Sequence, residues 1–159
     1  MAKVILICGK LCSGKTTYAH MLCQQEKAVL LSCDELMLSL LDEYLGERHE
    51  VYAQRTEAYL LQKSLEILRT GISVILDWGP WTKAGRSQLK TFYAKQGIQL
   101  ELHALRLKDA KWRARIAARN AAVEKRTYQA YHVDDGLLDK FQTHYEEPTA
   151  DEVDCWIDV

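Results

Sequence analysis

The sequence predicts one α/β domain built on a parallel β-sheet, and three observations support this prediction. The first is a continuous apolar run, residues 4–8, typical of a strand that is covered on both faces. The second is the glycine-containing stretch 9–16, which follows this run directly and precedes a helical pattern. The third is the alternation of strand-like and helix-like segments along the chain, because parallel strands need long crossover connections that are usually helices.

The individual elements follow from apolar runs, helical periodicity and the residues that end helices. Gly71 is expected to end one helix as a C-cap, and Thr82 and Asp134 are expected to begin two others as N-caps. Further strands are predicted at residues 28–32, 72–76, 98–107 and 154–159. Helices are predicted from residue 17, at 35–41, at about 50–70 with Ala58, Leu61, Leu65 and Leu68 at helical spacing, at 82–96, in the basic segment after residue 107, and at 134–144.

Length and composition suit a single domain, residues 1–159, with a sizeable core. No apolar run approaches the ~20 residues of a membrane span, and the N-terminus lacks a signal-peptide pattern, so we expect a cytoplasmic protein with no membrane partner. The five cysteines show no metal-ligand spacing, which is typical of reduced thiols. The net charge is −1, but residues 106–126 are basic, which indicates a local anionic ligand rather than a surface for duplex nucleic acid.

Residues 9–16 match G-x-x-x-x-G-K-[ST], the phosphate-binding P-loop. Its glycines allow a tight turn in which successive backbone N–H groups surround phosphate oxygens. Lys15 is expected to reach the β- and γ-phosphates, and the Thr16 hydroxyl to ligate Mg²⁺. The following helix adds the positive end of its dipole. The predicted nucleotide-binding residues of this segment are Gly9, Lys10, Leu11, Cys12, Ser13, Gly14, Lys15, Thr16 and Thr17, and the nucleotide-binding set also includes Arg115 and Arg119 of the basic segment.

Asp77 follows the predicted strand 72–76, at the position where phosphoryl-transfer enzymes carry a carboxylate near Mg²⁺. Thr16 and Asp77 are therefore the predicted metal ligands. The alternative is an aspartate that only opens the turn before Gly79 and Pro80. A switch GTPase would need glycine at position 80, and the segment TKAG is not a guanine-reading motif, so we expect ATP rather than GTP.

Several segments carry a family resemblance. In chain order they are CGKLCSGKTT, SCDEL, VILDWGPWTKAGR, WRARIAARN, VDDGLLDKF and EEPTADE. They resemble the small bacterial ATP-binding proteins of the AAA-type predicted-kinase group, which is related to nucleoside monophosphate kinases, polynucleotide 5′-kinases, chloramphenicol phosphotransferase and zeta toxins. The resemblance covers nearly the whole chain. It implies a three-layer P-loop NTPase fold with a five-stranded parallel sheet in the order 2-3-1-4-5, and it implies phosphoryl transfer more firmly than any one substrate.

Asp34 matches the aspartate with which polynucleotide kinases and chloramphenicol phosphotransferase accept the proton of the attacking hydroxyl. A carboxylate at this position could also orient the acceptor through a charge-assisted hydrogen bond. The alternative is a plain N-cap for the helix that follows, since Asp is a preferred capping residue.

Arg115 and Arg119 resemble the R-I-x-x-R opening of the nucleotide-kinase lid, which implies a short lid at about residues 113–132. Their i, i+4 spacing puts both guanidinium groups on one helix face. From there they could close over a triphosphate and neutralise charge in the transition state. Arg126 lies near the same stripe if the helix extends that far. The alternative is a set of ordinary solvated arginines.

The acceptor is less well defined by the sequence. Nucleoside monophosphate kinases carry an arginine for the acceptor phosphate soon after the strand-3 aspartate, but here that position is Trp81, with Lys83 and Arg86 further on. This difference favours a neutral, hydroxyl-bearing acceptor. An aromatic acceptor pocket and an ordinary core role are both open for Trp78, Trp81, Tyr44, Tyr52 and Tyr59.

The sequence therefore predicts an ATP- and Mg²⁺-dependent kinase with catalytic residues Lys15, Asp34, Arg115 and Arg119. It would transfer the γ-phosphoryl group to a hydroxyl of a small molecule, a nucleoside or a nucleic-acid 5′ end. The alternative is an ATP-binding or ATP-hydrolysing regulatory protein without a dedicated acceptor, and the choice between them depends on Asp34.

Overall fold

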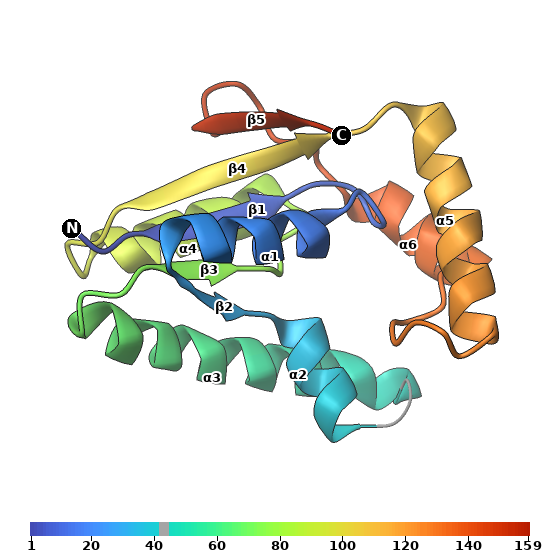
Figure 1. Cartoon of the computed structure of the whole chain (residues 1–159), viewed down its shortest axis with the longest axis horizontal. Coiled ribbons are helices and arrows are strands. Elements are labelled where there is room, and N and C mark those ends of the chain that lie inside the picture. The colour runs from blue at the N-terminus through green and yellow to red at the C-terminus, as the bar shows by residue number, and fades with distance from the viewer. Residues whose placement is uncertain (42–44) are drawn as a thin grey trace.

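A five-stranded parallel sheet forms the centre of the computed structural model, which describes residues 1–41 and 45–159 (Figure 1). The strands lie in the order β2-β3-β1-β4-β5, as predicted, and all four neighbouring pairs are parallel. The strands are β1 (Val4–Cys8), β2 (Val29–Leu31), β3 (Val74–Leu76), β4 (Leu100–Arg106) and β5 (Cys155–Asp158). The helices are α1 (Lys15–Glu26), α2 (Cys33–Leu40), α3 (His49–Arg69), α4 (Lys83–Ala94), α5 (Asp109–Glu124) and α6 (Asp135–His144), with a 3-10 turn at Gly46–Arg48.

Strand β1 is fully buried because helices cover both faces of the sheet. Its alternate residues point to opposite layers, as the two-residue period of a strand requires. Ile5 and Ile7 pack against α1, whereas Val4 and Leu6 belong to the cluster that includes residues of α3 and α4. The three-layer arrangement follows from this continuous apolar strand. No helix among the described residues is long and apolar enough to cross a membrane.

Most predicted helix ends are confirmed. The Thr82 hydroxyl accepts a hydrogen bond from the N–H of Gly85 at 3.1 Å, and the Asp134 carboxylate accepts one from the N–H of Leu137 at 2.7 Å. Gly71 has φ of 84°, the left-handed conformation expected just beyond a helix end.

Other features differ from the expectations or decide between alternatives that the sequence left open. Ser32, not Asp34, caps α2, because the Ser32 hydroxyl accepts from the N–H of Glu35 at 3.3 Å and Asp34 lies in the first helical turn. Helix α5 ends at Glu124, and Arg126, with φ of 53°, lies beyond it and does not continue the arginine stripe. Ala58 is exposed on α3, and β2 is only half-buried because it is an edge strand.

Candidate active site at the carboxyl ends of the strands

Every chemically interesting segment identified in the sequence lies beyond the carboxyl end of a strand. Residues 9–14 follow β1, Asp34 follows β2, Asp77 follows β3, and α5 follows β4. Because the strands are parallel, these ends meet at one edge of the sheet, where α/β proteins bind ligands. In Figure 1 the loop between β1 and α1 lies at this edge, on the side of α5.

The backbone of the loop, which we call the phosphate loop (residues 9–14), requires its glycines. Gly9 and Gly14 have φ of 154° and 99°, and a Cβ on Gly9 would lie 2.9 Å from Ser13 Oγ. Cys12 also has a positive φ of 56°, which is uncommon for a residue with a side chain. Helix α1 begins with no side-chain cap and no acidic residue in its first turn. Its N-terminus is therefore suited to an anion.

Lys15 folds back across the phosphate loop. Its Nζ donates hydrogen bonds to the carbonyl oxygens of Gly9 at 3.1 Å and Lys10 at 2.9 Å. Burial lowers the pKa of Lys15, and the nearby Asp77 carboxylate opposes this shift. A partly desolvated ammonium group next to open backbone N–H groups is a strong binding element for phosphate.

Thr16 and Asp77 are brought together, as the metal prediction requires. The Thr16 hydroxyl donates to Asp77 Oδ2 at 2.8 Å, and Asp77 is only 7% exposed. Burial raises the pKa of Asp77, whereas the hydrogen bond from Thr16 and the charge of Lys15 lower it. Gly79 lets the following loop lie against β1, since a Cβ there would be 2.6 Å from the Ile7 carbonyl oxygen.

These two oxygen groups fit a magnesium ion that is shared with a nucleotide. Mg²⁺ in kinase sites is usually held by one or two protein oxygens, with phosphate oxygens and water as its other ligands. Among residues 1–41 and 45–159 no three His, Cys, Asp or Glu side chains are grouped as a metal site would need. The donor set therefore suits a metal that arrives with a triphosphate.

Helix α5 packs directly against the phosphate loop through two predicted residues. Arg115 Nη1 donates to the Ser13 carbonyl oxygen at 2.6 Å, and Arg119 Nη1 lies 3.4 Å from Cys12 Sγ. The Nε of Arg119 is buried and has no hydrogen-bond partner among the described residues. Both guanidinium groups thus contact the phosphate loop itself.

Helix α5 makes further contacts with the phosphate loop that the sequence does not predict. Trp112 Nε1 donates to the Leu11 carbonyl oxygen at 2.6 Å, and Lys10 forms an ion pair with Asp109 at 2.7 Å. The Lys10 ammonium also lies 5.0 Å from the centre of the Trp112 ring. The only signal in the sequence was the helical spacing of Trp112 and Arg115, which predicts a shared face but no partner.

Asp34 is exposed in the first turn of α2, and its negative charge affects the pKa values of other residues in the site. It opposes the lowering of the pKa of Lys15 and adds to the raised pKa of Asp77. Burial, and then Asp34, raise the pKa of Tyr131 to about 12. The charge of Asp34 is therefore felt by the ionisable groups of the phosphate loop and of the segment after α5.

The segment after α5 extends this side of the site to α2 and α3. Gln129 Nε2 donates to the Leu38 carbonyl oxygen at 3.0 Å, and the ring of Tyr131 meets that of His49 edge-on with centroids 5.0 Å apart. Glu57 of α3 is half-buried, and its pKa is raised by burial and then by the charges of Glu50 and Asp34. Nothing in the sequence singled out Glu57 or Tyr131.

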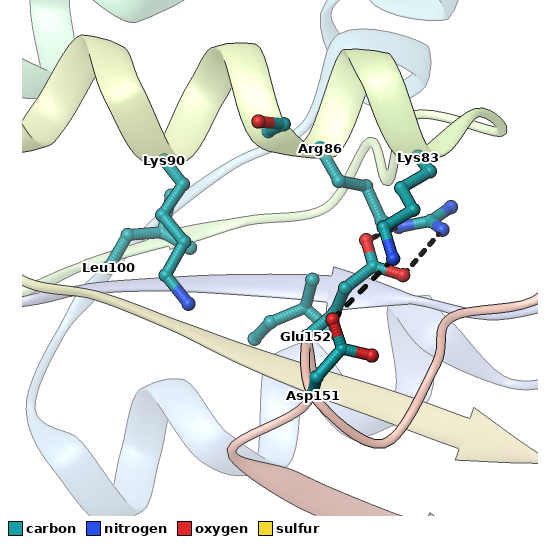
Figure 2. A pocket seen from close by; sticks show the side chains of 8 residues that line it. Lys83, Arg86, Lys90, Leu100, Asp151 and Glu152 are labelled. Carbon is teal, nitrogen blue, oxygen red and sulfur yellow. Dashed lines mark hydrogen bonds and ion pairs between the residues drawn. The ribbon is translucent and has the colours of Figure 1, made fainter.

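Lys83 and Arg86 are the cations next to the expected acceptor region, but both side chains bind residues of the segment before β5. Arg86 is 2% exposed and forms a bidentate pair with Glu152, at 3.0 and 3.1 Å. Lys83 Nζ contacts Thr149 Oγ1 at 3.2 Å and Asp151 at 3.5 Å. Figure 2 shows Lys83, Arg86, Asp151 and Glu152 around a cavity of about 210 Å³ between α4 and the segment before β5. This cavity lies on the sheet face opposite α1, and most of its charged groups are paired with one another.

Among the described residues, the aromatic side chains considered for an acceptor pocket do not gather into one. Trp81 packs edge-on against Phe141, with ring centroids 5.2 Å apart, and Trp78 packs against the core. The Tyr52 hydroxyl accepts a hydrogen bond from Arg48 at 2.8 Å, and Tyr59 is exposed. Tyr44 lies outside the described residues. The core interpretation therefore holds for the two tryptophans.

Comparisons with known proteins agree with this fold. A family model described as an AAA domain matches residues 4–148. Kti12 from Chaetomium thermophilum in complex with ADP-AlF3 has a TM-score of 0.67 at 19% identity, over 98% of this chain and 88% of that chain. A gluconokinase from Sinorhizobium meliloti has a TM-score of 0.64 at 14% identity, over 99% of this chain and 81% of that chain.

The APS kinase CysC of Mycobacterium tuberculosis, in complex with AMPPNP and APS, has a TM-score of 0.61 at 16% identity, over 99% of this chain and 88% of that chain. At such identities the likeness shows the fold. No curated protein sequence matches the chain significantly.

Proposed function

The chain belongs to the AAA-domain family whose model matches residues 4–148, and on this premise we propose that it is an ATP- and Mg²⁺-dependent kinase. It transfers the γ-phosphoryl group of ATP to a hydroxyl of a small molecule, a nucleoside or a nucleic-acid 5′ end. One observation carries the proposal: the Thr16–Asp77 pair, Lys15 and two α5 arginines all lie around a single phosphate loop. Similar folds that are named as a gluconokinase and an APS kinase support phosphoryl transfer in general.

Each group has a separate task in this reaction. The open N–H groups of the phosphate loop and the Lys15 ammonium hold the β- and γ-phosphates. Thr16 and Asp77 would hold Mg²⁺, which when bound supplies positive charge beside the same phosphates. Arg115 and Arg119 neutralise the charge that spreads over the transferred group.

Asp34 acts on the acceptor. Its carboxylate accepts a hydrogen bond from the attacking hydroxyl and orients that hydroxyl in line with the γ-phosphate. It takes the hydroxyl proton as the new P–O bond forms, while the bond between the γ-phosphorus and the β,γ-bridging oxygen breaks and ADP leaves. The finding that Ser32 caps α2 supports this assignment, because it leaves the exposed Asp34 without a capping role.

Among these acceptors we favour a small molecule or a nucleoside that carries no phosphate of its own over a nucleic-acid 5′ end. Lys83 and Arg86 are engaged with the segment before β5, so they are not available as a fork for an acceptor phosphate. The charge of Asp34 raises the pKa of Glu57, so the two carboxyl groups act on each other electrostatically. Negative charge at these two groups would repel an anionic acceptor.

The test is to incubate the protein with γ-labelled ATP, Mg²⁺ and pooled nucleosides, sugars, antibiotics and oligonucleotides. Each nucleoside is paired with its 5′-monophosphate. We expect label on an uncharged hydroxyl compound and none with Lys15→Ala. Release of label only as inorganic phosphate would favour the alternative, an ATP-hydrolysing regulatory protein without an acceptor. Failure to bind ATP would overturn both functions.

A further inference from the structure

Two side chains of α5 donate hydrogen bonds to carbonyl oxygens of the phosphate loop. Trp112 Nε1 donates to the Leu11 carbonyl and Arg115 Nη1 to the Ser13 carbonyl, both at 2.6 Å. The sequence predicts neither contact. It predicts Arg115 as a partner of the triphosphate, and it predicts no partner for Trp112. Trp112 is 7% exposed and packs against Phe141 of α6, so its indole ring is held firmly.

The position of these carbonyls decides where the next N–H groups point. A trans peptide bond is planar, and its C=O and N–H point in opposite directions. When the Leu11 carbonyl faces Trp112, the N–H of Cys12 must face away from α5, toward the interior of the loop. The same reasoning applies to the Ser13 carbonyl and the N–H of Gly14.

The hydrogen-bond pattern agrees with this geometry. Among the described residues neither the Cys12 N–H nor the Gly14 N–H has an acceptor. Inward-facing N–H groups without a partner are what a phosphate ligand requires. Cys12 moreover has a left-handed backbone, a conformation disfavoured for a residue with a Cβ unless the surroundings stabilise it.

We infer that Trp112 is a positioning residue for the phosphate loop: its indole N–H keeps the Leu11–Cys12 peptide oriented so that the Cys12 N–H meets a bound phosphate. Arg115 does the same for the Ser13–Gly14 peptide. Helix α5 therefore orients peptide groups of the phosphate loop, in addition to supplying the charge of its arginines. The inference rests on the proposed nucleotide-binding function.

The first experiment compares Trp112→Phe with Trp156→Phe. Phe keeps an aromatic ring in the core but lacks the N–H, and Trp156 lies on β5 with its ring against Arg106. Because Trp112→Phe loses one buried hydrogen bond, it should bind both ATP and inorganic tripolyphosphate about 5- to 10-fold more weakly. Both affinities should remain within twofold of wild type in Trp156→Phe.

A purely structural role for Trp112 would lower the melting temperature without changing either affinity, and that result would overturn the inference. So would a loss confined to ATP, since tripolyphosphate reports on the phosphate loop alone. A wild-type protein that binds neither compound would remove the proposed function and the inference together, whereas normal binding by Trp112→Phe removes only the inference.

A second experiment uses the unmodified protein in case Trp112→Phe fails to fold. Coupling between two sites is reciprocal, so a phosphate that needs the oriented loop must also strengthen the Trp112 hydrogen bond. In nitrogen-15 NMR spectra, saturating ATP should slow hydrogen exchange of the Trp112 indole N–H by at least about fivefold. The Trp156 indole serves as the control, and an unchanged Trp112 rate would overturn the inference.

Discussion

Replacing Asp34 by Asn tests the proposed chemistry most directly, because it removes the base and almost nothing else. Asn has the same shape and still accepts a hydrogen bond, but it cannot take the proton of an acceptor hydroxyl. General-base removal typically lowers the rate about 10²- to 10⁴-fold. Lys15, Thr16 and Asp77 are unchanged, so we expect ATP affinity to stay within about threefold of wild type.

The structure also sets the expected change in stability. Ser32 caps α2, so Asp34→Asn leaves the cap intact. It removes the repulsion of Asp34 from the Asp77 and Glu57 carboxylates, and it loses the favourable interaction of a charge with the helix dipole. At an exposed first-turn position this amounts to about 0.3–1 kcal/mol. For a domain of this size that corresponds to a fall in melting temperature of about 1–4 °C. Ser32→Ala should instead cost about 1 kcal/mol of stability, with transfer retained.

Glu35 provides the matched control. It lies in the same turn, is also acidic and exposed, and has no assigned role. Transfer to the acceptor should collapse in Asp34→Asn but not in Glu35→Gln, while both melt within a few degrees of wild type. The measurements are transfer of label, ATP titration and thermal unfolding of Asp34→Asn, Glu35→Gln and Ser32→Ala. Normal transfer by Asp34→Asn would refute the base assignment.

Four other predictions concern the rest of the chain. Lys15→Ala should lower the affinity for ATP about 10- to 100-fold in a binding titration, because charge-assisted hydrogen bonds to phosphate are lost. Arg119→Ala should lower kcat more than it raises the dissociation constant of ATP, since its charge matters most in the transition state. Burial raises the pKa of Asp77, so ionisation of this carboxyl destabilises the fold as pH rises through the raised pKa. Asp77→Asn should therefore raise the melting temperature at neutral pH. The same variant should weaken Mg²⁺-dependent ATP binding. Glu152, whose pKa is lowered to about 2 by its hydrogen bond from Arg86, should contribute stability that is lost as pH falls from about 4.5 to about 2, and Glu152→Gln should abolish that part of the acid sensitivity.

Each of these predictions has a clear contrary result. Wild-type affinity in Lys15→Ala would contradict the P-loop assignment. Weaker ATP binding with a normal kcat would limit Arg119 to ground-state recognition. An Asp77→Asn variant with unchanged Mg²⁺ dependence would remove Asp77 from the metal site. Acid unfolding is monitored by circular dichroism. If Glu152→Gln and wild type lose stability equally as the pH falls, the Glu152–Arg86 pair is not responsible for the acid sensitivity.

The fold was largely predictable because its signals are local. A buried parallel strand is apolar at every position, as residues 4–8 are, and helix ends at Thr82, Asp134 and Gly71 are marked by single residue types. The P-loop spacing is also local, since the turn that holds phosphate is formed by eight consecutive residues. The cap of α2 was missed because Ser32 and Asp34 are both preferred capping residues, and only the observed start of the helix distinguishes them.

The site itself depended on contacts that leave no pattern in the chain. Trp112 and Arg115 reach carbonyl groups 101 and 102 residues away, and any donor of the right length could have made these bonds. Arg86 might equally have faced an acceptor by its position in the sequence, but Glu152, 66 residues away, holds it inside the fold. Local periodicity determined the strands, the helices and the phosphate loop of this protein. Tertiary packing alone decided which charged side chains remain available to a ligand, because a long side chain can reach in several directions and only its neighbours in space select one.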